Sequence, residues 1–419
     1  MSDTHNELKI FAADSAMGIA AAVSAAPSII VVALMLERAG LDFSVGCATG
    51  FIGSALMTAI FAWRRVPLVA APSPAVALWL VLTESVAFGA TLEGIRAASI
   101  AAYLVALLTV TLPLNGKKLL PQNLYPPLTA SLALMLIVVG LLAGRVLVAS
   151  PLTVTMFGSL ADPFCFVTVL GCVFTLGLAA SGIRAALFWG FVGTFLYAYN
   201  GGFVVLPETM FVFSGNAASE FMRLDFGELP VLTHIVPTLA IIVILGNVAV
   251  IDGLLPGSVL PDERRRSLFT ICGGGIIGLI IGALPIFAAP ESAALQKVSS
   301  PRTATAAAAL FFATAGLFAV PVMHELADFA AVFAPLLIVS GCLLIARSPN
   351  ILCGDMADKA TGVMLLVALP LAQDPALGLG TGLLFYVFLK IMHGKRRDLM
   401  VGTVLLALLT FMVAFGARF

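Results

Sequence analysis

The chain has 419 residues, of which 61% are hydrophobic and only 11% are charged. This composition excludes an ordinary soluble domain and is typical of a membrane protein with many spans. The 22 basic and 22 acidic residues cancel, so we expect no nucleic-acid partner. The six cysteines have neither CxxC spacing nor metal-type histidine spacing, and we expect no metal site and no cofactor.

Apolar segments separated by charged or turn residues follow one another along the whole chain. They lie near 14–36, 43–62, 68–88, 96–114, 122–143, 163–180 and 184–205, and then near 234–258, 268–284, 286–300, 303–322, 328–346, 359–371, 375–392 and 398–417. We predict an all-α polytopic protein with about 14 spans. Its parts are a first seven-span repeat (1–205), a connecting loop outside the membrane (206–233), a second repeat (234–394) and an additional apolar segment (395–419). Whether 398–417 crosses the bilayer stays open.

The distribution of basic residues gives the orientation. Lys and Arg prefer the cytoplasmic side of a membrane. With the N-terminus inside, 17 of the 22 basic residues are cytoplasmic. Because seven is odd, the second repeat then enters the membrane upside down relative to the first, which predicts inverted repeats. We expect a multi-pass protein of the plasma (inner) membrane with a cytoplasmic N-terminus.

The tenth segment has an unusual length. Residues 267–290 form a run of 24 residues without a charge, too long for one span of roughly 20 residues and too short for two. We predict a helix over 268–284 and then an extended return through 284–290. Six extended residues cover roughly 20 Å, which would bring Glu291 near the bilayer midplane at the start of a short helix.

The third segment has matching features. After Arg64 and Arg65, residues 66–71 can run extended, and Pro72-Ser73-Pro74 offers a helix start with Ser73 as the N-cap. We therefore predict that spans 3 and 10 are each a short strand plus a half-helix. The two strands should pair with each other, and the two helix N-termini should face one another across a small cavity.

Two acids inside predicted spans are candidates for functional groups. Asp252 follows 17 uncharged residues in the eighth span, and Asn247 lies five residues earlier. Carboxylates at this depth are costly, so we expect Asp252 and Glu291 to bind substrate and to couple its movement to protons. The alternatives are a structural role for Asp252 and a helix-capping role for Glu291. The complete predicted binding site is Glu291, Asp252, Ser73, Ala289, Ser292 and Asn247.

Several stretches are similar to motifs of one transporter family. Pro290-Glu291-Ser292-Ala293-Ala294 looks like its ESAAG-type motif, Val250-Ile251-Asp252-Gly253 like its FDT-type motif, and 67–72 like its PIALAPG stretch. The chain resembles the nucleobase:cation symporters of the xanthine/uracil permease superfamily, within it the AzgA-like hypoxanthine/guanine/adenine permeases. It departs from them where Ala77 replaces the asparagine of the third span and Ser300-Pro301 replaces a glycine pair.

The resemblance implies a 14-span fold divided into a core domain and a gate domain. It also implies proton-coupled import of purine nucleobases, recognised by Asp252 and Glu291, with the lipid bilayer as surroundings and a homodimer left open. The alternatives on the same fold are an anion transporter like the sulfate permeases and a permease for uracil or another heterocycle. An enzyme is not expected, because the apolar spans hold no nucleophile with a base, and a channel would need a continuous polar stripe.

Overall fold

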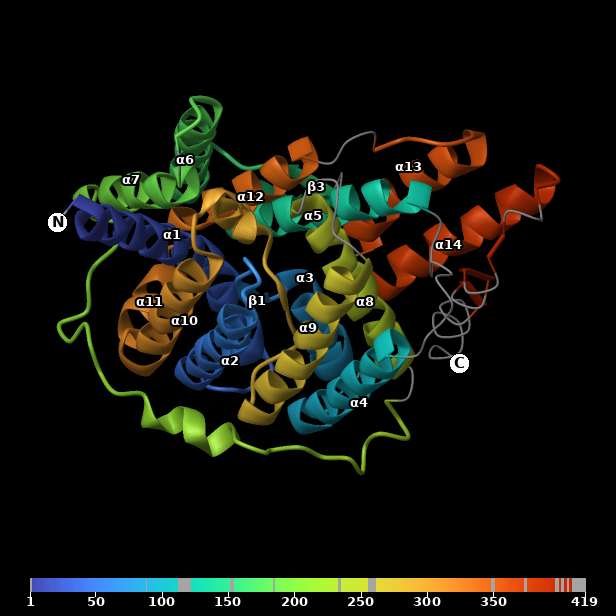
Figure 1. Cartoon of the computed structure of the whole chain (residues 1–419), viewed down its shortest axis with the longest axis horizontal. Helices are drawn as coiled ribbons and strands as arrows, with labels where there is room; N and C mark the ends of the chain where they lie inside the picture. The colour runs from blue at the N-terminus through green and yellow to red at the C-terminus, as the bar shows by residue number, and fades with distance from the viewer. Residues whose placement is uncertain are drawn as a thin grey trace.

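The computed structural model of the chain is mainly helical (Figure 1). It describes residues 2–87, 89–111, 122–150, 154–183, 185–232, 235–254, 261–347, 351–372 and 375–395, with three short pieces at 399–400, 403–404 and 407–408. Five helices of this part are long and apolar enough to cross a membrane, or six when the bent pair of residues 301–318 and 320–328 is taken as one span. The predicted segment 398–417 lies almost entirely outside the described residues.

The first repeat contains seven of the predicted segments in the predicted order. Its elements are α1 (Ser2–Arg38), α2 (Phe43–Arg64), β1 (Ala70–Pro72), α3 (Pro74–Ala77), the π-helix η1 (Leu78–Ala87), α4 (Leu92–Thr111), the 3₁₀ turn η2 (Gln122–Leu124), α5 (Tyr125–Ala143), β2 (Leu147–Ser150), β3 (Val154–Phe157), α6 (Pro163–Ala180) and α7 (Ala186–Asn200). A connector follows, and it contains the 3₁₀ helix η3 (Gly215–Glu220).

The second repeat follows the same plan. Its elements are α8 (Ile235–Leu254), α9 (Pro261–Ile281), β4 (Ile286–Ala288), the 3₁₀ helix η4 (Pro290–Lys297), α10 (Pro301–Phe318), α11 (Val320–Asp328), the 3₁₀ turn η5 (Ala330–Val332), α12 (Ala334–Arg347), α13 (Met356–Ala372) and α14 (Pro375–Met392). The helix α11 bends away from α10 by 84°. The strand β4 and the half-helix η4 correspond to β1 and α3 of the first repeat.

The helices form two groups, and each group draws on both halves of the chain (Figure 1). In the core domain α2 packs on α1, α9 and α10, while α4 packs on α8 and α9. In the gate domain α5 packs on α12 and α13, α13 packs on α14, and α6 packs on α7 and α12. Glycines allow the closest approaches: a Cβ atom at Gly18 of α1 would overlap the backbone of Ala304 in α10. The expected division into core and gate is confirmed.

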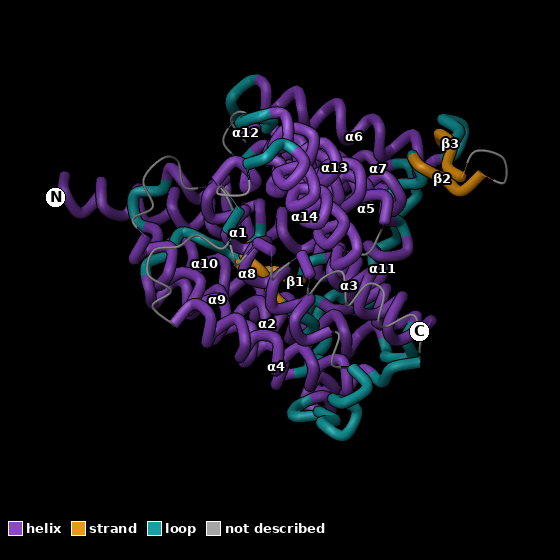
Figure 2. The backbone as a smooth tube through the Cα atoms, turned by 90° about the vertical axis from the view of Figure 1, so that its right-hand side faces the viewer, coloured by secondary structure: helices purple, strands orange, loops and turns teal. Residues whose placement is uncertain are grey.

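The two short strands β1 and β4 pair with each other inside the helical body (Figure 2). They are antiparallel, with Ala70 opposite Ala288 and Pro72 opposite Ile286. All six residues of the pair are buried. The crossing of interrupted spans that the sequence predicted is therefore present.

The hairpin formed by β2 and β3 was not predicted. It continues α5, with Leu147 opposite Phe157 and Ser150 opposite Val154, and it projects from the helical body in Figure 2. Arg145 takes the left-handed conformation (φ 53°) at the turn into β2, and its guanidinium stacks on Phe164 at 4.0 Å from the ring centre. The sequence analysis predicts no strand between the fifth and sixth apolar segments.

The connector of residues 201–232 runs around the core domain (Figure 1). Its backbone N–H groups donate to carbonyl groups at helix ends: Val212 to Phe318 of α10, and Met222 to Ile280 of α9. Glu220 accepts hydrogen bonds from the buried Arg96 of α4 at 2.6 Å and from Arg223 at 2.9 Å. Burial by itself raises the pKa of Glu220. The guanidinium groups of Arg96 and Arg223 together lower it by a larger amount, so the pKa lies below its ordinary value.

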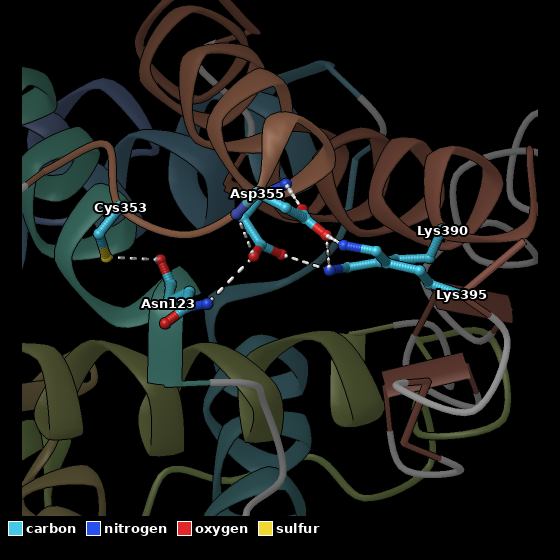
Figure 3. Close-up of polar contacts among 6 residues, drawn as sticks. Asn123, Cys353, Asp355, Lys390 and Lys395 are labelled. Atoms are coloured by element: carbon cyan, nitrogen blue, oxygen red, sulfur yellow. Dashed lines mark hydrogen bonds and ion pairs between the residues drawn. The ribbon is translucent and has the colours of Figure 1, made fainter. Parts of the chain in front are cut away.

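A second ion-pair cluster joins three elements of the gate domain (Figure 3). Asp355 accepts hydrogen bonds from Lys395 at 2.8 Å and from Lys390 of α14 at 2.9 Å. Asp358 of α13 accepts a hydrogen bond from Asn123 at 3.0 Å and pairs with Lys390. The ammonium groups of Lys395 and Lys390 hold the pKa of Asp355 well below its usual range. The cluster ties the start of α13 to the end of α14 and to the chain before α5.

Candidate functional site

Both interrupted spans restart as helices at the crossing of the strands. Ser73 is the N-cap of α3 with Pro74 at the first helical position, and Ala289 is the N-cap of η4 with Pro290 at the first position. Proline suits this position because the first helical N–H has no partner within the helix. The helix starts are as predicted, but η4 is a 3₁₀ helix and α3 continues as a π-helix. The Ser73 side chain makes no capping hydrogen bond.

A cavity of about 80 Å³ lies between these helix starts and the gate domain. Its wall consists of Ser28, Ala71, Pro72, Ser73, Pro74, Ala75, Val76, Leu132, Leu136, Ile242, Gly246, Val250, Phe287, Ala288, Ala289, Pro290, Glu291 and Leu344. Leu132 and Leu136 come from α5 and Leu344 from α12, so the cavity lies on the boundary between core and gate. An apolar wall with a few polar groups is typical of sites for small organic ligands.

Glu291 is the acidic side chain of this wall. It is 1% exposed, and neither carboxyl oxygen has a hydrogen-bond partner among the described residues. The capping alternative stays open, because the carboxyl group interacts with the backbone N–H of Glu291 itself, although without the geometry of a full hydrogen bond. A buried carboxylate without partners is unfavourable, so this group has capacity for a proton or for a ligand that donates hydrogen bonds.

Asp252 lies in α8, as predicted, two residues before the last residue of that helix. Its side chain is outside the part of the structure that is described, so its role stays a prediction. Other residues of α8, Gly246 and Val250, do line the cavity.

Asn247 and Ser292 support the strand crossing and are absent from the cavity wall. Asn247 is 0% exposed, and its side-chain oxygen accepts the N–H of Ala288 at 2.8 Å while its amide donates to Val243 in its own helix at 2.7 Å. The Ser292 hydroxyl accepts the N–H of Val69 at 2.8 Å. Ala289 lines the cavity, and its N–H donates to the carbonyl of Val69.

Two supporting residues were missed in the sequence. The Tyr103 hydroxyl of α4 donates to the carbonyl of Ile286 at 2.7 Å, and the Thr58 hydroxyl of α2 accepts the N–H of Ala70 at 3.1 Å. In lipid there is no water to satisfy the outer edges of a two-stranded sheet, so side chains must do so. The signal was present as polar residues within apolar spans, but their partners lie far away in sequence.

This arrangement defines a class of protein. A cavity at the meeting point of two interrupted spans, on the boundary between two domains, is the site of a membrane transporter. Among the described residues there is no group of three His, Cys, Asp or Glu side chains that could hold a metal.

Solved structures share the fold. The transmembrane domain of the cyanobacterial bicarbonate transporter BicA matches with a TM-score of 0.59 and 14% identity, over 85% of this chain and 95% of that one. SLC26A9 matches with a TM-score of 0.61 and 12% identity, over 90% of this chain and 65% of that one. Both have the inverted-repeat fold with a core and a gate.

No family model matches the chain, but curated proteins do. The guanine/hypoxanthine permease PbuO of Bacillus subtilis is 24% identical over 316 residues, 71% of each chain. The adenine permease AdeP of Escherichia coli is 23% identical over 303 residues, 69% of this chain and 66% of AdeP. The protein is thus a multi-pass membrane transporter and not an enzyme. It is a divergent relative of nucleobase permeases of the xanthine/uracil permease family.

Proposed function

We propose that the protein imports purine nucleobases together with protons by alternating access. The observation that carries the proposal is Glu291, a buried carboxyl group without a full hydrogen bond among the described residues, in the wall of a mainly apolar cavity. The relatives PbuO and AdeP, which are permeases for guanine, hypoxanthine and adenine, support the choice of substrate class.

The chemistry of a purine suits this wall. Its flat faces are apolar and fit between Phe287 on the core side and Leu132 and Leu136 on the gate side. Its N–H groups lie on the ring edges and need acceptors, which carboxylates supply. Glu291 accepts such an N–H in our proposal, Asp252 supplies a second acceptor, and Ser73 contributes a hydroxyl group.

Proton coupling follows from the same carboxyl group. A proton on Glu291 removes a charge that is costly in lipid, and the protonated carboxyl can donate its O–H to a ring nitrogen of the base while its carbonyl oxygen accepts a ring N–H. Binding of base and of proton are therefore linked through one side chain. The strand crossing makes α3 and η4 move together with the core domain, while α5 and α12 stay with the gate, and this relative motion opens the cavity to one side and then to the other. We place the N-terminus in the cytoplasm and the protein in the plasma membrane.

Anion transport is the second candidate. BicA, a bicarbonate transporter, has this fold, and two helix N-termini at the cavity offer partial positive charge. The charge of Glu291 opposes it, because an ionised carboxylate repels an anion.

The test is uptake of labelled hypoxanthine, guanine, adenine, xanthine, uracil and bicarbonate by cells that lack their own permeases, with and without a protonophore. We expect uptake of at least one purine base that the protonophore abolishes. Purine uptake that survives the protonophore would remove the proton coupling. Bicarbonate uptake without any base uptake would favour the anion transporter.

A further inference from the structure

Ser340 lies on the face of α12 that is turned toward the core domain. Leu336, Ser340 and Leu344 are spaced four residues apart and so form one stripe along the helix. Leu344 belongs to the cavity wall, whereas Ser340 does not. Gly341, the next residue, lies against Ile137 and Ala133 of α5, which places the gate neighbour on a different side of the helix.

The hydroxyl group of Ser340 differs from most buried hydroxyl groups in the helices of this protein. Ser24, Ser99 and Thr175 each donate to the carbonyl four residues earlier, at 2.7 Å in all three cases. This bond is the usual solution for a serine or threonine in a helix. Ser340 is 4% exposed, and its hydroxyl has no hydrogen-bond partner among the described residues.

Glu291 is the polar group beside it. The half-helix η4 packs against α12, and the Ser340 hydroxyl faces the Glu291 carboxyl without reaching the geometry of a full hydrogen bond. Two buried side chains that lack a full hydrogen bond among the described residues thus lie next to each other, one on each side of the boundary between gate and core. The two domains move against each other in the proposed mechanism, which opens the cavity first to one side of the membrane and then to the other. The contact between Ser340 and Glu291 therefore exists in only one of these two conformations.

We propose that Ser340 is a positioning residue that holds the Glu291 carboxyl against the gate domain in this conformation. The inference rests on the proposed function only in that Glu291 binds the cargo. Ser340 acts through Glu291: it fixes the direction of the carboxyl group and adds one polar contact that must break before the core domain can move. A cargo that donates an N–H to Glu291 on the cavity side replaces this contact.

The consequence is a difference between two transport modes. Exchange of labelled for unlabelled base uses only the loaded carrier, whereas net uptake also requires the carrier to return without base. A contact that cargo replaces affects the return step far more than the loaded step. An ordinary hydrogen bond contributes about 1 kcal/mol, a factor of about 5 in an equilibrium. The weaker contact of Ser340 with Glu291 should therefore change the ratio of net uptake to exchange about twofold to threefold.

The experiment compares Ser340→Ala and Ser340→Thr with the wild type in both modes, at equal amounts of protein in the membrane. The matched control is Thr361→Val, which removes another buried hydroxyl of the gate domain that has no described partner. We expect Ser340→Ala to change the ratio, Ser340→Thr to restore it because the hydroxyl is kept, and the control to leave it unchanged. An unchanged ratio in Ser340→Ala, or a Thr variant that behaves like the Ala variant, would overturn the inference.

A second measurement does not depend on transport. Thermal unfolding of the purified protein is recorded for Ser340→Ala, for Glu291→Met and for the double variant. Interacting side chains give non-additive shifts in Tm, here of about 1 °C or more, while the cycle of Thr361→Val with Glu291→Met should be additive. Additive shifts in the Ser340 cycle would refute the contact itself. If the wild type carries no purine but the Ser340 cycle is non-additive, the proposed function fails and the contact stands.

Discussion

Asn247 is the side chain whose loss should show most clearly how the strand crossing is held. Substitution by leucine keeps the branched shape and the number of side-chain heavy atoms but removes the acceptor for the N–H of Ala288 and the donor to Val243. The N–H of Ala288 is then left unpaired in a dry interior. Leaving one such group unsatisfied costs about 1–3 kcal/mol.

The assay has two arms. The first is thermal unfolding of the purified protein, where about 2 kcal/mol in a chain of this size corresponds to a fall in Tm of a few degrees. The second is uptake of labelled base, which should fall at least about tenfold, because a misplaced β4 moves Glu291 from its position and small displacements of a binding group are costly. Thr361→Val serves as the control, since it removes a buried hydroxyl for which the described structure shows no partner.

The two arms also distinguish the two roles of Asn247. The sequence suggested that it binds substrate, and the structure uses both ends of its amide to join α8 to β4. A supporting role predicts that Tm and transport fall together. If Asn247→Leu lost transport with an unchanged Tm, the supporting role would be wrong and direct contact with the cargo would be favoured.

Three further predictions concern stability. Glu220 has a lowered pKa in the folded protein, so its contribution to stability is present above about pH 5 and is lost as the pH falls toward the folded pKa. Urea unfolding at several pH values should show this loss in the wild type but not in Glu220→Gln. Gly18→Leu should prevent close packing of α1 on α10 and greatly reduce the amount of folded protein in the membrane, as detergent gel filtration would show. Lys390→Met leaves Asp355 with one ammonium partner fewer and should lower Tm, whereas Lys359→Met should not.

The interrupted spans were predictable because their signals are local. The charge-free run before Glu291 has a length that fits neither one helix nor two, and the prolines at 74 and 290 mark the helix starts. Pairing of the strands then followed from the absence of water in lipid. The division into core and gate came from the family resemblance and is confirmed by the packing of the helices.

The supporting contacts could not be predicted in the same way. Tyr103 and Ile286 are 183 residues apart, and Ser292 and Val69 are 223 apart, so nothing local indicates that they bond. Asn247 was recognised as a polar residue at membrane depth, but the sequence does not tell whether its amide faces a cavity or a strand edge. The hairpin of β2 and β3 and the bonds of the connector to α9 and α10 likewise depend on packing between distant segments.

The most direct test of the account is the transport activity of Glu291→Gln. This substitution keeps the shape of the side chain but removes its charge and its ability to exchange a proton. We expect the protein to reach the membrane in normal amounts and to lose proton-dependent uptake of purine base. Normal uptake by this variant, with the same sensitivity to pH and to a protonophore as the wild type, would contradict the central claim that the buried carboxyl group binds the cargo and its proton.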